Sequence, residues 1–483
     1  MSAKELHLSV VDQNTVRVYT QLFLIFGFPD GNQAESAIKA LAKGLQVTLT
    51  VLPFLAGTLR LVDSKSGKLS LTYPSKAPDV QSSRLLTSKH LPDFPHTYKQ
   101  LKSKGMPPSA ITSKTFCPED LRRFRGVPED GEGIVDFTKS EAPVMRIQAF
   151  FVPGGLILGI YTHHAVLDFS GMNKFWENFA QSVFGQNDKS FPCELDLPDQ
   201  SKLRSQLDAR IPMHAKGLDK IESYVNGKFE YQKTLPPGPE TPRSQKLFVI
   251  SAKRIRSFRS ELQDQSGLQI SICNVITALL WIHVTRARAP RLQLPEFNYE
   301  DSSIGISVNT RKRMTPQISD EYTGNMALFA KATRPIAKLI AEERVTSTTI
   351  LATIKHIKAA IDQVDNDWVY QHLSFFKSVN PITDTECALR FGLGPDLYIT
   401  SWMNFPALET KWNIPGTSSA QPEFIRRAYN PSDGGMNIMP RIRTPVDGVD
   451  APYEVVVRLA TEDMNKVLAE EGGLASWAER VID

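Results

Sequence analysis

The chain has 483 residues, of which 41% are hydrophobic and 22% are charged. This composition is ordinary for a folded protein and excludes an intrinsically disordered chain. The net charge of +4 arises from 56 basic and 52 acidic residues without a long run of either sign. Such a balance gives no electrostatic footprint for binding nucleic acid or an anionic membrane. The length exceeds the size at which single cores usually divide, so we expect two domains of roughly 200 residues each.

The sequence shows no secretion signal and no membrane span. The N-terminal segment MSAKELHLSVVDQ lacks the apolar region and cleavage site of a signal peptide. The most apolar stretch, residues 142–161, is interrupted by Arg146, Gln148 and a Pro-Gly-Gly turn, so we do not expect it to cross a membrane. Four cysteines lie far apart and form no CxxC pair: Cys117, Cys193, Cys273 and Cys387. We therefore expect a reduced, cytoplasmic chain without a metal site.

The first part of the chain alternates strands and helices. Apolar residues recur at helical spacing in residues 32–53 and 171–184, which predicts a helix in each. Two-residue alternation on both sides of a Ser-Lys-Ser-Gly turn predicts a β-hairpin over residues 57–74. Residues 144–164 predict a second hairpin, whose second arm is almost wholly apolar, as in a strand buried on both faces. Together these elements predict an N-terminal α/β domain over residues 1–205.

A change in composition separates this domain from the next. Residues 206–245 include KTLPPGPETPRSQ, which is rich in proline and charge and is typical of a linker. We expect a second α/β domain over residues 246–483. Its predicted elements are a strand and helix in 246–262, a helix over 271–288, a strand over 303–309, a long helical region around 337–364, and strands over 397–403, 434–442 and 453–460.

The segment YTHHAVLDFSG, residues 161–171, carries the most informative polar residues. His163 and His164 end a strand of the buried type, and Asp168 begins the connection to a helix. Titratable groups at a strand end that faces a loop are typical of active sites, and a neutral imidazole can accept a proton from an alcohol or amine. The residues alone leave three alternatives: histidines packed in the core, a metal site that lacks a third ligand of suitable spacing, and Asp168 as a helix cap.

Further segments extend this motif over nearly the whole chain. In order they are LSVVDQ, LPFLAGTLR, APVMRIQAFFVPGGLILGIYTHHAVLD, SICNVITALLWIHVTRAR, SVNTRKRMTPQISDEYTGN and ITSWMNFPALETKWNIPG. In these segments the chain resembles the BAHD acyltransferases, which are HxxxD transferases that use acyl-CoA. It resembles more closely their fungal members in secondary metabolism, the trichothecene 3-O-acetyltransferase-like proteins. The resemblance implies an α/β (α+β) fold of two chloramphenicol-acetyltransferase-like domains with a solvent channel at their interface.

The resemblance also implies roles for particular residues. His164 is the implied general base that deprotonates the acceptor, which then attacks the thioester carbonyl of acyl-CoA directly. Asp168 is implied to be structural, and Arg311 in VNTRKR occupies the position of its ion-pair partner. Thr400, Ser401 and Trp402 match the strand that lines the tunnel for the pantetheine arm of CoA.

The chain departs from the family pattern on the acceptor side. Phe169 stands where the family commonly has glycine, so we expect it to narrow the channel or reshape the acceptor pocket. The family's DFGWG segment falls at WNIPG in this chain. The group that stabilises the oxyanion is therefore not assigned, and the candidates are the Trp412 indole and a backbone N–H. Lys253 and Arg254 near a helix start are expected either to meet the CoA phosphates or to form a solvated helix face. Asn325 is expected to serve structure.

The resemblance predicts an acyltransferase of the EC 2.3.1 type. We expect an O-acetyltransferase that moves acetyl from acetyl-CoA to a hydroxyl of a fungal terpenoid, alkaloid, polyketide or modified peptide, with N-acylation as a close variant. The expected partners of this monomer are acetyl-CoA and a small-molecule acceptor, without a bound cofactor, nucleic acid or membrane. One alternative is a condensation-type domain fed by carrier proteins, against which the missing glycine after Asp168 argues. The other is a ligand-binding relative without catalysis, against which the intact His164 argues.

Overall fold

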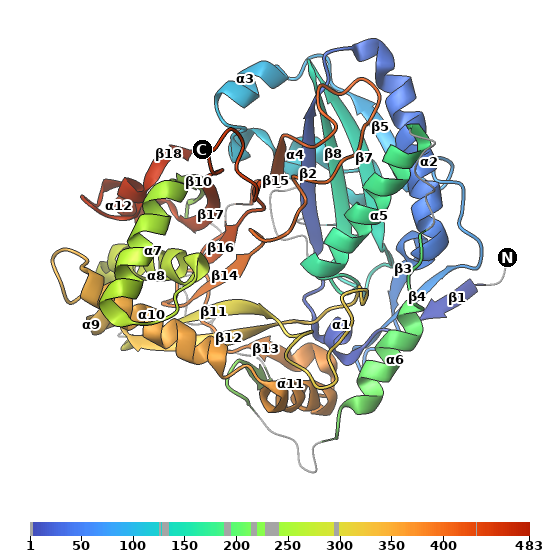
Figure 1. The fold of residues 1–483 in the computed structure, drawn as a ribbon. Coiled ribbons are helices and arrows are strands. Elements are labelled where there is room, and N and C mark those ends of the chain that lie inside the picture. The colour runs from blue at the N-terminus through green and yellow to red at the C-terminus, as the bar shows by residue number, and fades with distance from the viewer. Residues whose placement is uncertain are drawn as a thin grey trace.

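The structure, a computed structural model, describes residues 3–124, 127, 135–187, 195–213, 220–227, 241–293, 299–430 and 432–483. These residues form two mixed α/β halves, each with a main sheet and its own buried apolar cluster (Figure 1). The predicted class, a two-domain α/β fold, is confirmed. Much of the predicted linker (214–219 and 228–240) and Cys193 lie outside the described residues.

The main sheet of the N-terminal half carries the strand that leads into the histidine pair. Its strands in spatial order are β15 (Phe424–Arg427), β2 (Tyr19–Gly27), β8 (Gly155–His163), β7 (Met145–Val152) and β5 (Leu86–His90). The predicted hairpin forms, with Val152 opposite Gly155 in the antiparallel β7–β8 pair. All nine residues of β8 are buried, as its apolar sequence predicts, because the sheet is covered on both faces.

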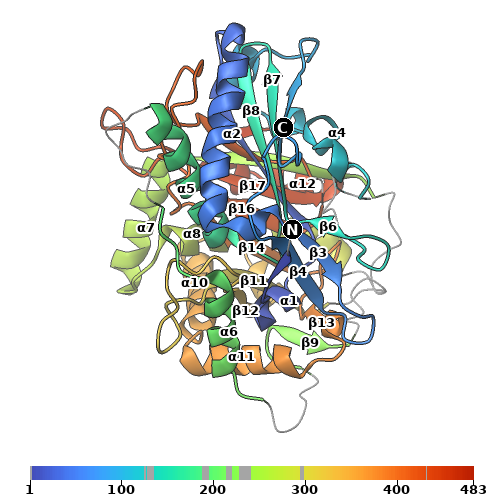
Figure 2. The ribbon, with the colours of Figure 1, turned by 90° about the vertical axis from the view of Figure 1, so that its right-hand side faces the viewer.

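Two long helices cover one face of this sheet. α2 (Ala34–Val51) and α5 (Phe169–Asn187) place their apolar residues in the same buried cluster as β2, β7 and β8, and Figure 2 shows α2 lying in front of β7 and β8, roughly along their direction. Gly44 lets the two helices approach closely, since a Cβ at this position would lie 2.4 Å from Cγ2 of Val183. The helix pair thus fixes α5, which begins next to the HHxxxD segment.

The remaining elements of the N-terminal half are short. A second sheet contains β1 (Ala3–Leu6), β4 (Leu69–Pro74), β3 (Thr58–Leu61) and β6 (Ala142–Pro143). The short helices are α1 (Val10–Asn14), α3 (Tyr98–Ser103), α4 (Ser113–Phe116) and α6 (Gln200–Arg210). β3 and β4 are the predicted hairpin over residues 57–74.

The C-terminal half is built on a seven-stranded sheet. In spatial order its strands are β12 (Ala327–Pro335), β11 (Asp301–Asn309), β14 (Leu397–Ser401), β16 (Gly435–Ile438), β17 (Tyr453–Ala460), β10 (Arg243–Ile250) and β18 (Ala478–Ile482). A small pair, β9 (Tyr224–Asn226) and β13 (Thr385–Cys387), accompanies it. Its helices are α7 (Ala252–Ser266), α8 (Ile272–Leu292), α9 (Ile336–Leu339), α10 (Ser347–Asp362), α11 (Asn366–Ser378) and α12 (Thr461–Ala469).

Two features differ from the sequence-based expectations. The long helical region predicted around 337–364 consists of two helices, α9 and α10, because Thr346 caps a new helix by accepting a hydrogen bond from the Thr349 N–H. β15, from the C-terminal half of the sequence, pairs with β2 in the N-terminal sheet, with Phe424 opposite Ile25 (Figure 1). The predicted division at residues 206–245 therefore does not separate the two sheets completely.

Within the described ranges, no helix combines the length and the apolar character needed to cross a membrane.

Candidate active site

The HHxxxD segment forms the turn between β8 and α5. β8 ends at His163, and α5 begins at Phe169. The His164 N–H donates to the Val18 carbonyl at 2.8 Å, and the Val166 N–H donates to the His163 carbonyl at 3.0 Å. The turn is therefore tied to the residues preceding β2 as well as to its own strand.

His164 faces a central cavity of about 820 Å³ that is lined by residues of both halves. Its side chain is half-buried, and its Nδ1 is buried with no hydrogen-bond partner among the described residues. Nε2 is thus the ring nitrogen left to meet a molecule in the cavity. Burial lowers the pKa of His164 below its ordinary value, although the interaction with its own main chain and the charge of Asp168 both oppose this effect. The imidazole is therefore neutral near pH 7 and able to accept a proton.

His163 has a different environment. It is fully buried, and its ring packs edge-on against Tyr19 at 5.3 Å and Phe137 at 5.4 Å between ring centroids. Its Nδ1 accepts the Ala165 N–H at 3.3 Å. Burial lowers the pKa of His163 to about 3, so this ring stays neutral and acts as part of the core.

Asp168 is held by a buried arginine. Arg311 Nη1 and Nη2 donate to its two carboxylate oxygens at 2.8 and 3.0 Å, and both side chains are almost completely buried. The N–H groups of Gly171 and Met326 each donate to Asp168 at 2.9 Å. Because four donors occupy its oxygens, Asp168 is committed to closing the turn and capping α5. It leaves no oxygen that would orient His164.

The end of β14 supplies another part of the cavity wall. Thr400, Ser401 and Trp402 all line it, so the structure brings this strand end and His164 to one cavity. Phe169, which also lines the cavity, stacks on Trp402 with ring centroids 4.1 Å apart and an interplanar angle of 12°. This stack joins the first residue of α5 to the C-terminal half and narrows the space beside the histidine turn.

The structure places three other predicted site residues elsewhere. Trp412 is fully buried between Phe179 and Phe26 of the N-terminal core, so its side chain does not reach the central cavity. Lys253 and Arg254 line a separate depression of about 450 Å³ at the start of α7. The Arg254 guanidinium lies 4.3 Å from the centroid of the Trp477 ring, which together with the Ser476 carbonyl orients it there.

The cavity wall also contains Arg427, which was not predicted from the sequence, and Asn325, which was expected only to serve structure. Arg427, at the end of β15, lies 5.5 Å from the centroid of the Trp402 ring and donates to Asn437 Oδ1 at 3.0 Å. No motif marks it, because its strand pairs with β2 some 400 positions earlier in the chain. Asn325 also lines the cavity and donates through Nδ2 to the His164 carbonyl at 2.9 Å.

The two α/β halves share a central cavity, and comparisons with known proteins identify the class to which such a chain belongs. The Transferase family matches residues 134–472, and the trichothecene 3-O-acetyltransferase-like N-terminal domain matches residues 18–182. The chain belongs to the Transferase family, and the resemblance to the BAHD acyltransferases is confirmed. It is an acyltransferase.

Named relatives and solved structures match over nearly the whole chain. The trichothecene 8-O-acetyltransferase of Fusarium sporotrichioides is 24% identical over 502 residues, which cover 97% of each chain. The eremophilane O-acetyltransferase ORF8 of Penicillium roqueforti is 25% identical, again over 97% of each chain. F. graminearum TRI101 complexed with coenzyme A and deoxynivalenol superposes with a TM-score of 0.76 at 17% identity, covering 99% of each chain. Vinorine synthase superposes with a TM-score of 0.60 at 16% identity, and the match covers 96% of this chain and 92% of its own.

Proposed function

We propose that this protein is an acetyl-CoA-dependent O-acetyltransferase that acts on a hydroxyl group of a fungal secondary metabolite. The observation that carries the proposal is a neutral His164 that presents Nε2 to a cavity shared with the strand end Thr400–Trp402. The names of the relatives support it, since they include O-acetyltransferases of trichothecenes and eremophilanes. The cavity volume also suits a small multi-ring alcohol together with the end of a pantetheine arm.

The proposed reaction is a direct transfer. His164 Nε2 accepts the proton of the acceptor hydroxyl while its oxygen attacks the thioester carbonyl carbon of acetyl-CoA. The new C–O bond gives a tetrahedral oxyanion, which collapses as the C–S bond breaks. The thiolate of CoA takes the proton from His164 as it leaves, which restores the neutral base. The cavity holds both reactants close together, which replaces a bimolecular collision with an oriented encounter.

We propose separate places for the two substrates in this cavity. Thr400, Ser401 and Trp402 line the side on which the pantetheine arm of CoA runs, and Phe169 borders the acceptor. Trp412 is not proposed as an oxyanion contact, because its ring is enclosed in the N-terminal core. Lys253 and Arg254, outside the cavity, are proposed contacts for the CoA phosphates beyond the pantetheine arm.

We further propose that the protein works as a cytoplasmic monomer. The Cys273 and Cys387 thiols are free, as is usual in a reducing compartment. One chain supplies both walls of the cavity, and the small net charge favours neither nucleic acid nor an anionic membrane as a partner. Light scattering of the purified protein tests the oligomeric state.

The test of the function is turnover with defined acyl donors. Purified protein is incubated with acetyl-CoA or longer acyl-CoAs and a panel of trichothecene, eremophilane and other fungal alcohols, and free thiol and product mass are followed. We expect acetylated product, and a loss of about 100-fold or more in His164→Ala. The matched control is His356→Ala, which replaces an exposed histidine of α10 and should keep full activity.

Three outcomes would contradict the proposal. The first is that no acyl-CoA yields product with any alcohol, and the second is full activity in His164→Ala. The third is transfer from an acyl carrier protein in place of CoA, which would favour the condensation-type alternative.

A further inference from the structure

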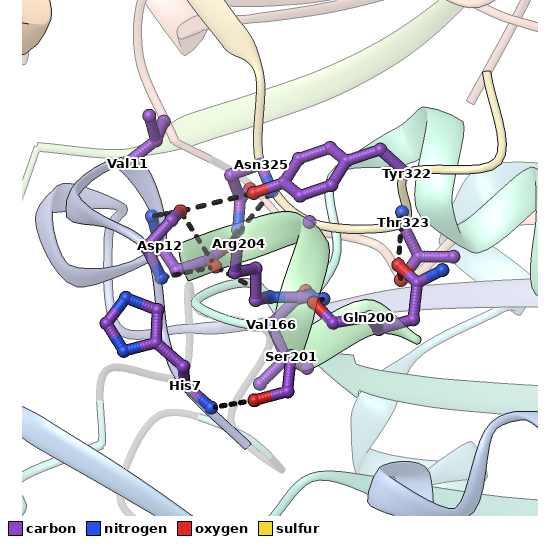
Figure 3. Close-up of polar contacts among 12 residues, drawn as sticks. His7, Val11, Asp12, Val166, Gln200, Ser201, Arg204, Tyr322, Thr323 and Asn325 are labelled. Atoms are coloured by element: carbon purple, nitrogen blue, oxygen red, sulfur yellow. Dashed lines mark hydrogen bonds and ion pairs between the residues drawn. The ribbon is translucent and has the colours of Figure 1, made fainter. Parts of the chain in front are cut away.

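A buried polar network lies directly behind the histidine turn. It joins Asp12 of α1, Arg204 of α6 and Asn325 of the segment before β12, and Figure 3 shows these three side chains meeting at the Asp12 carboxylate. Asp12 and Arg204 are completely buried and Asn325 is 2% exposed. The network therefore joins three chain segments that are 192 and 313 positions apart.

Asp12 is saturated with donors. Its Oδ2 accepts from Arg204 Nε at 2.9 Å and from the Ser9 N–H and hydroxyl at 3.0 and 2.9 Å. Its Oδ1 accepts the Asn325 N–H at 2.9 Å and Asn325 Nδ2 at 2.8 Å. A buried carboxylate is tolerable because a guanidinium and these donors replace its hydration. Its position is thereby fixed by both halves of the chain.

Two of the partners of Asp12, Asn325 and Arg204, also donate to carbonyls of the histidine turn. Asn325 Nδ2 carries two hydrogens, one toward Asp12 Oδ1 and one toward the His164 carbonyl at 2.9 Å. Arg204 Nη2 donates to the Val166 carbonyl at 2.9 Å. One carboxylate thus sets the positions of two carbonyls on either side of Ala165, in the turn that carries the base.

We propose that Asp12, Asn325 and Arg204 are positioning residues, which hold the His164 main chain so that the ring presents Nε2 to the cavity. This inference rests on the proposed function of His164. The His164 N–H is already fixed by Val18, so the Asn325 amide completes the restraint by fixing the carbonyl of the same residue. A base displaced by about 1 Å can lose about 100-fold in rate, because proton transfer requires short, aligned contacts.

The test compares three variants. Asn325→Ala removes the donor to the His164 carbonyl. Arg204→Lys keeps a cation beside Asp12 but loses the planar fork that also reaches Val166. Asn178→Ala is the matched control: the Asn178 side chain is 8% exposed and donates to the Lys174 carbonyl at 2.7 Å on α5, away from the residues that line the cavity.

The readouts are steady-state kinetics, CoA affinity by calorimetry, thermal unfolding and crystal structures. We expect Asn325→Ala to lower kcat about 10- to 100-fold, while the Kd of CoA and the KM of acetyl-CoA stay within about threefold. Arg204→Lys should lower kcat less, and it should likewise keep the Kd of CoA and the KM of acetyl-CoA within about threefold. Asn178→Ala should lose stability but keep its kcat. In the crystal structure of Asn325→Ala, the His164 carbonyl and ring should be displaced relative to the wild-type protein.

Two results would overturn the inference. One is a kcat in Asn325→Ala no lower than in Asn178→Ala; the other is a fall in CoA affinity as large as the fall in kcat. If Asn325→Ala fails to fold, Arg204→Lys gives the same comparison. If the wild-type protein transfers no acyl group, the proposed function fails, whereas an undisplaced His164 turn in the variant crystals contradicts the positioning role itself.

Discussion

His163 and His164 are neighbours in the chain, yet their surroundings give them different properties. His163 is enclosed by Tyr19 and Phe137, which exclude both water and substrate. His164 buries Nδ1 but borders the cavity, so burial depresses its basicity without removing its access to an acceptor. The position at the end of β8 produces this difference, because the first residue beyond the strand turns away from the core.

The depressed pKa of His164 predicts the pH dependence of catalysis. A base must be neutral to act, and a lowered pKa keeps the imidazole neutral to a lower pH than a free histidine. In the pH profile of kcat/KM, we therefore expect the acidic limb to have its midpoint below about pH 6.5. Activity should be full at pH 7 and fall only under more acidic conditions. An acidic limb with its midpoint at or above about pH 6.5 would show that the ring is hydrated or paired with a carboxylate.

Phe169 is expected to limit the size of the acceptor. Phe169→Ala removes the ring that stacks on Trp402 beside the base and enlarges the cavity there. We expect kcat/KM for the bulkier of two accepted alcohols to rise at least about threefold relative to the smaller one, because the steric exclusion is worth about 1 kcal/mol. Phe94→Ala, which removes a ring packed on Phe116 outside the cavity, is the control and should leave the ratio unchanged. An unchanged ratio in Phe169→Ala would contradict a role in acceptor selection.

His164 could be singled out from the sequence as the predicted base, but several of the groups that surround it could not. The HHxxxD motif, Arg311 and the Thr400–Trp402 strand were found because ordered segments survive in the chain. Trp412 lies in the N-terminal core and not at the cavity, since a matched segment gives the order of residues and not the direction of side chains. Asp12, Arg204 and Asn325 meet only through tertiary structure, which no local pattern reports. Asp12 alone had a signal, as it lies three residues after Ser9 in a capping-box pattern.

Among secondary-structure elements, long periodic segments such as α2 and α8 were predicted well, whereas the short strand β15 was not. α2, α8 and the β7–β8 hairpin follow the expected ranges because many apolar positions define each period. β15 was missed, since its four residues FIRR carry two charges and no readable alternation. Its place in the sheet comes from pairing with β2, which is a long-range contact.

The start of α5 should tolerate no side chain at Gly171. A Cβ built there would lie 2.0 Å from the Thr323 carbonyl oxygen, which belongs to the main chain and cannot turn aside. We expect Gly171→Ala to lower the free energy of unfolding by about 1–3 kcal/mol or more, because the helix must move away from the segment that holds Asn325. Urea unfolding measures this loss.

Gly31→Ala provides the comparison. A Cβ at Gly31 meets nothing within 4 Å, so the free energy of unfolding should change by less than about 0.5 kcal/mol. Equal losses in the two variants would mean that the contact with Thr323 is not the cause.

On the scale of the whole molecule, the two halves are interlocked and do not merely touch. β15 crosses from the C-terminal half of the sequence into the N-terminal sheet, and α6 carries Arg204 to Asp12 beneath the histidine turn. The cavity needs both halves, because His164 lies on one and the end of β14 on the other. The contacts that hold the two halves together are therefore needed to keep the cavity walls in place.

Arg426 is the residue that should test this interlock. It lies in β15, is 1% exposed, and pairs with Glu454 of β17 at 2.8 Å, which connects the two main sheets. It also donates to the Gly105 and Met106 carbonyls at 2.9 and 2.8 Å. We expect Arg426→Met to lower the free energy of unfolding by about 3–5 kcal/mol, because the partner carboxylate and both carbonyls lose a buried donor.

An exposed pair supplies the control for that measurement. Arg443 makes a comparable contact with Glu409 at 2.6 Å, but its side chain is 47% exposed. Arg443→Met should therefore cost no more than about 1 kcal/mol, since water replaces the lost partner. Urea unfolding followed by tryptophan fluorescence compares the two variants. Equal losses would mean that the contact between the sheets adds nothing beyond a surface ion pair, and that other contacts keep the cavity walls together.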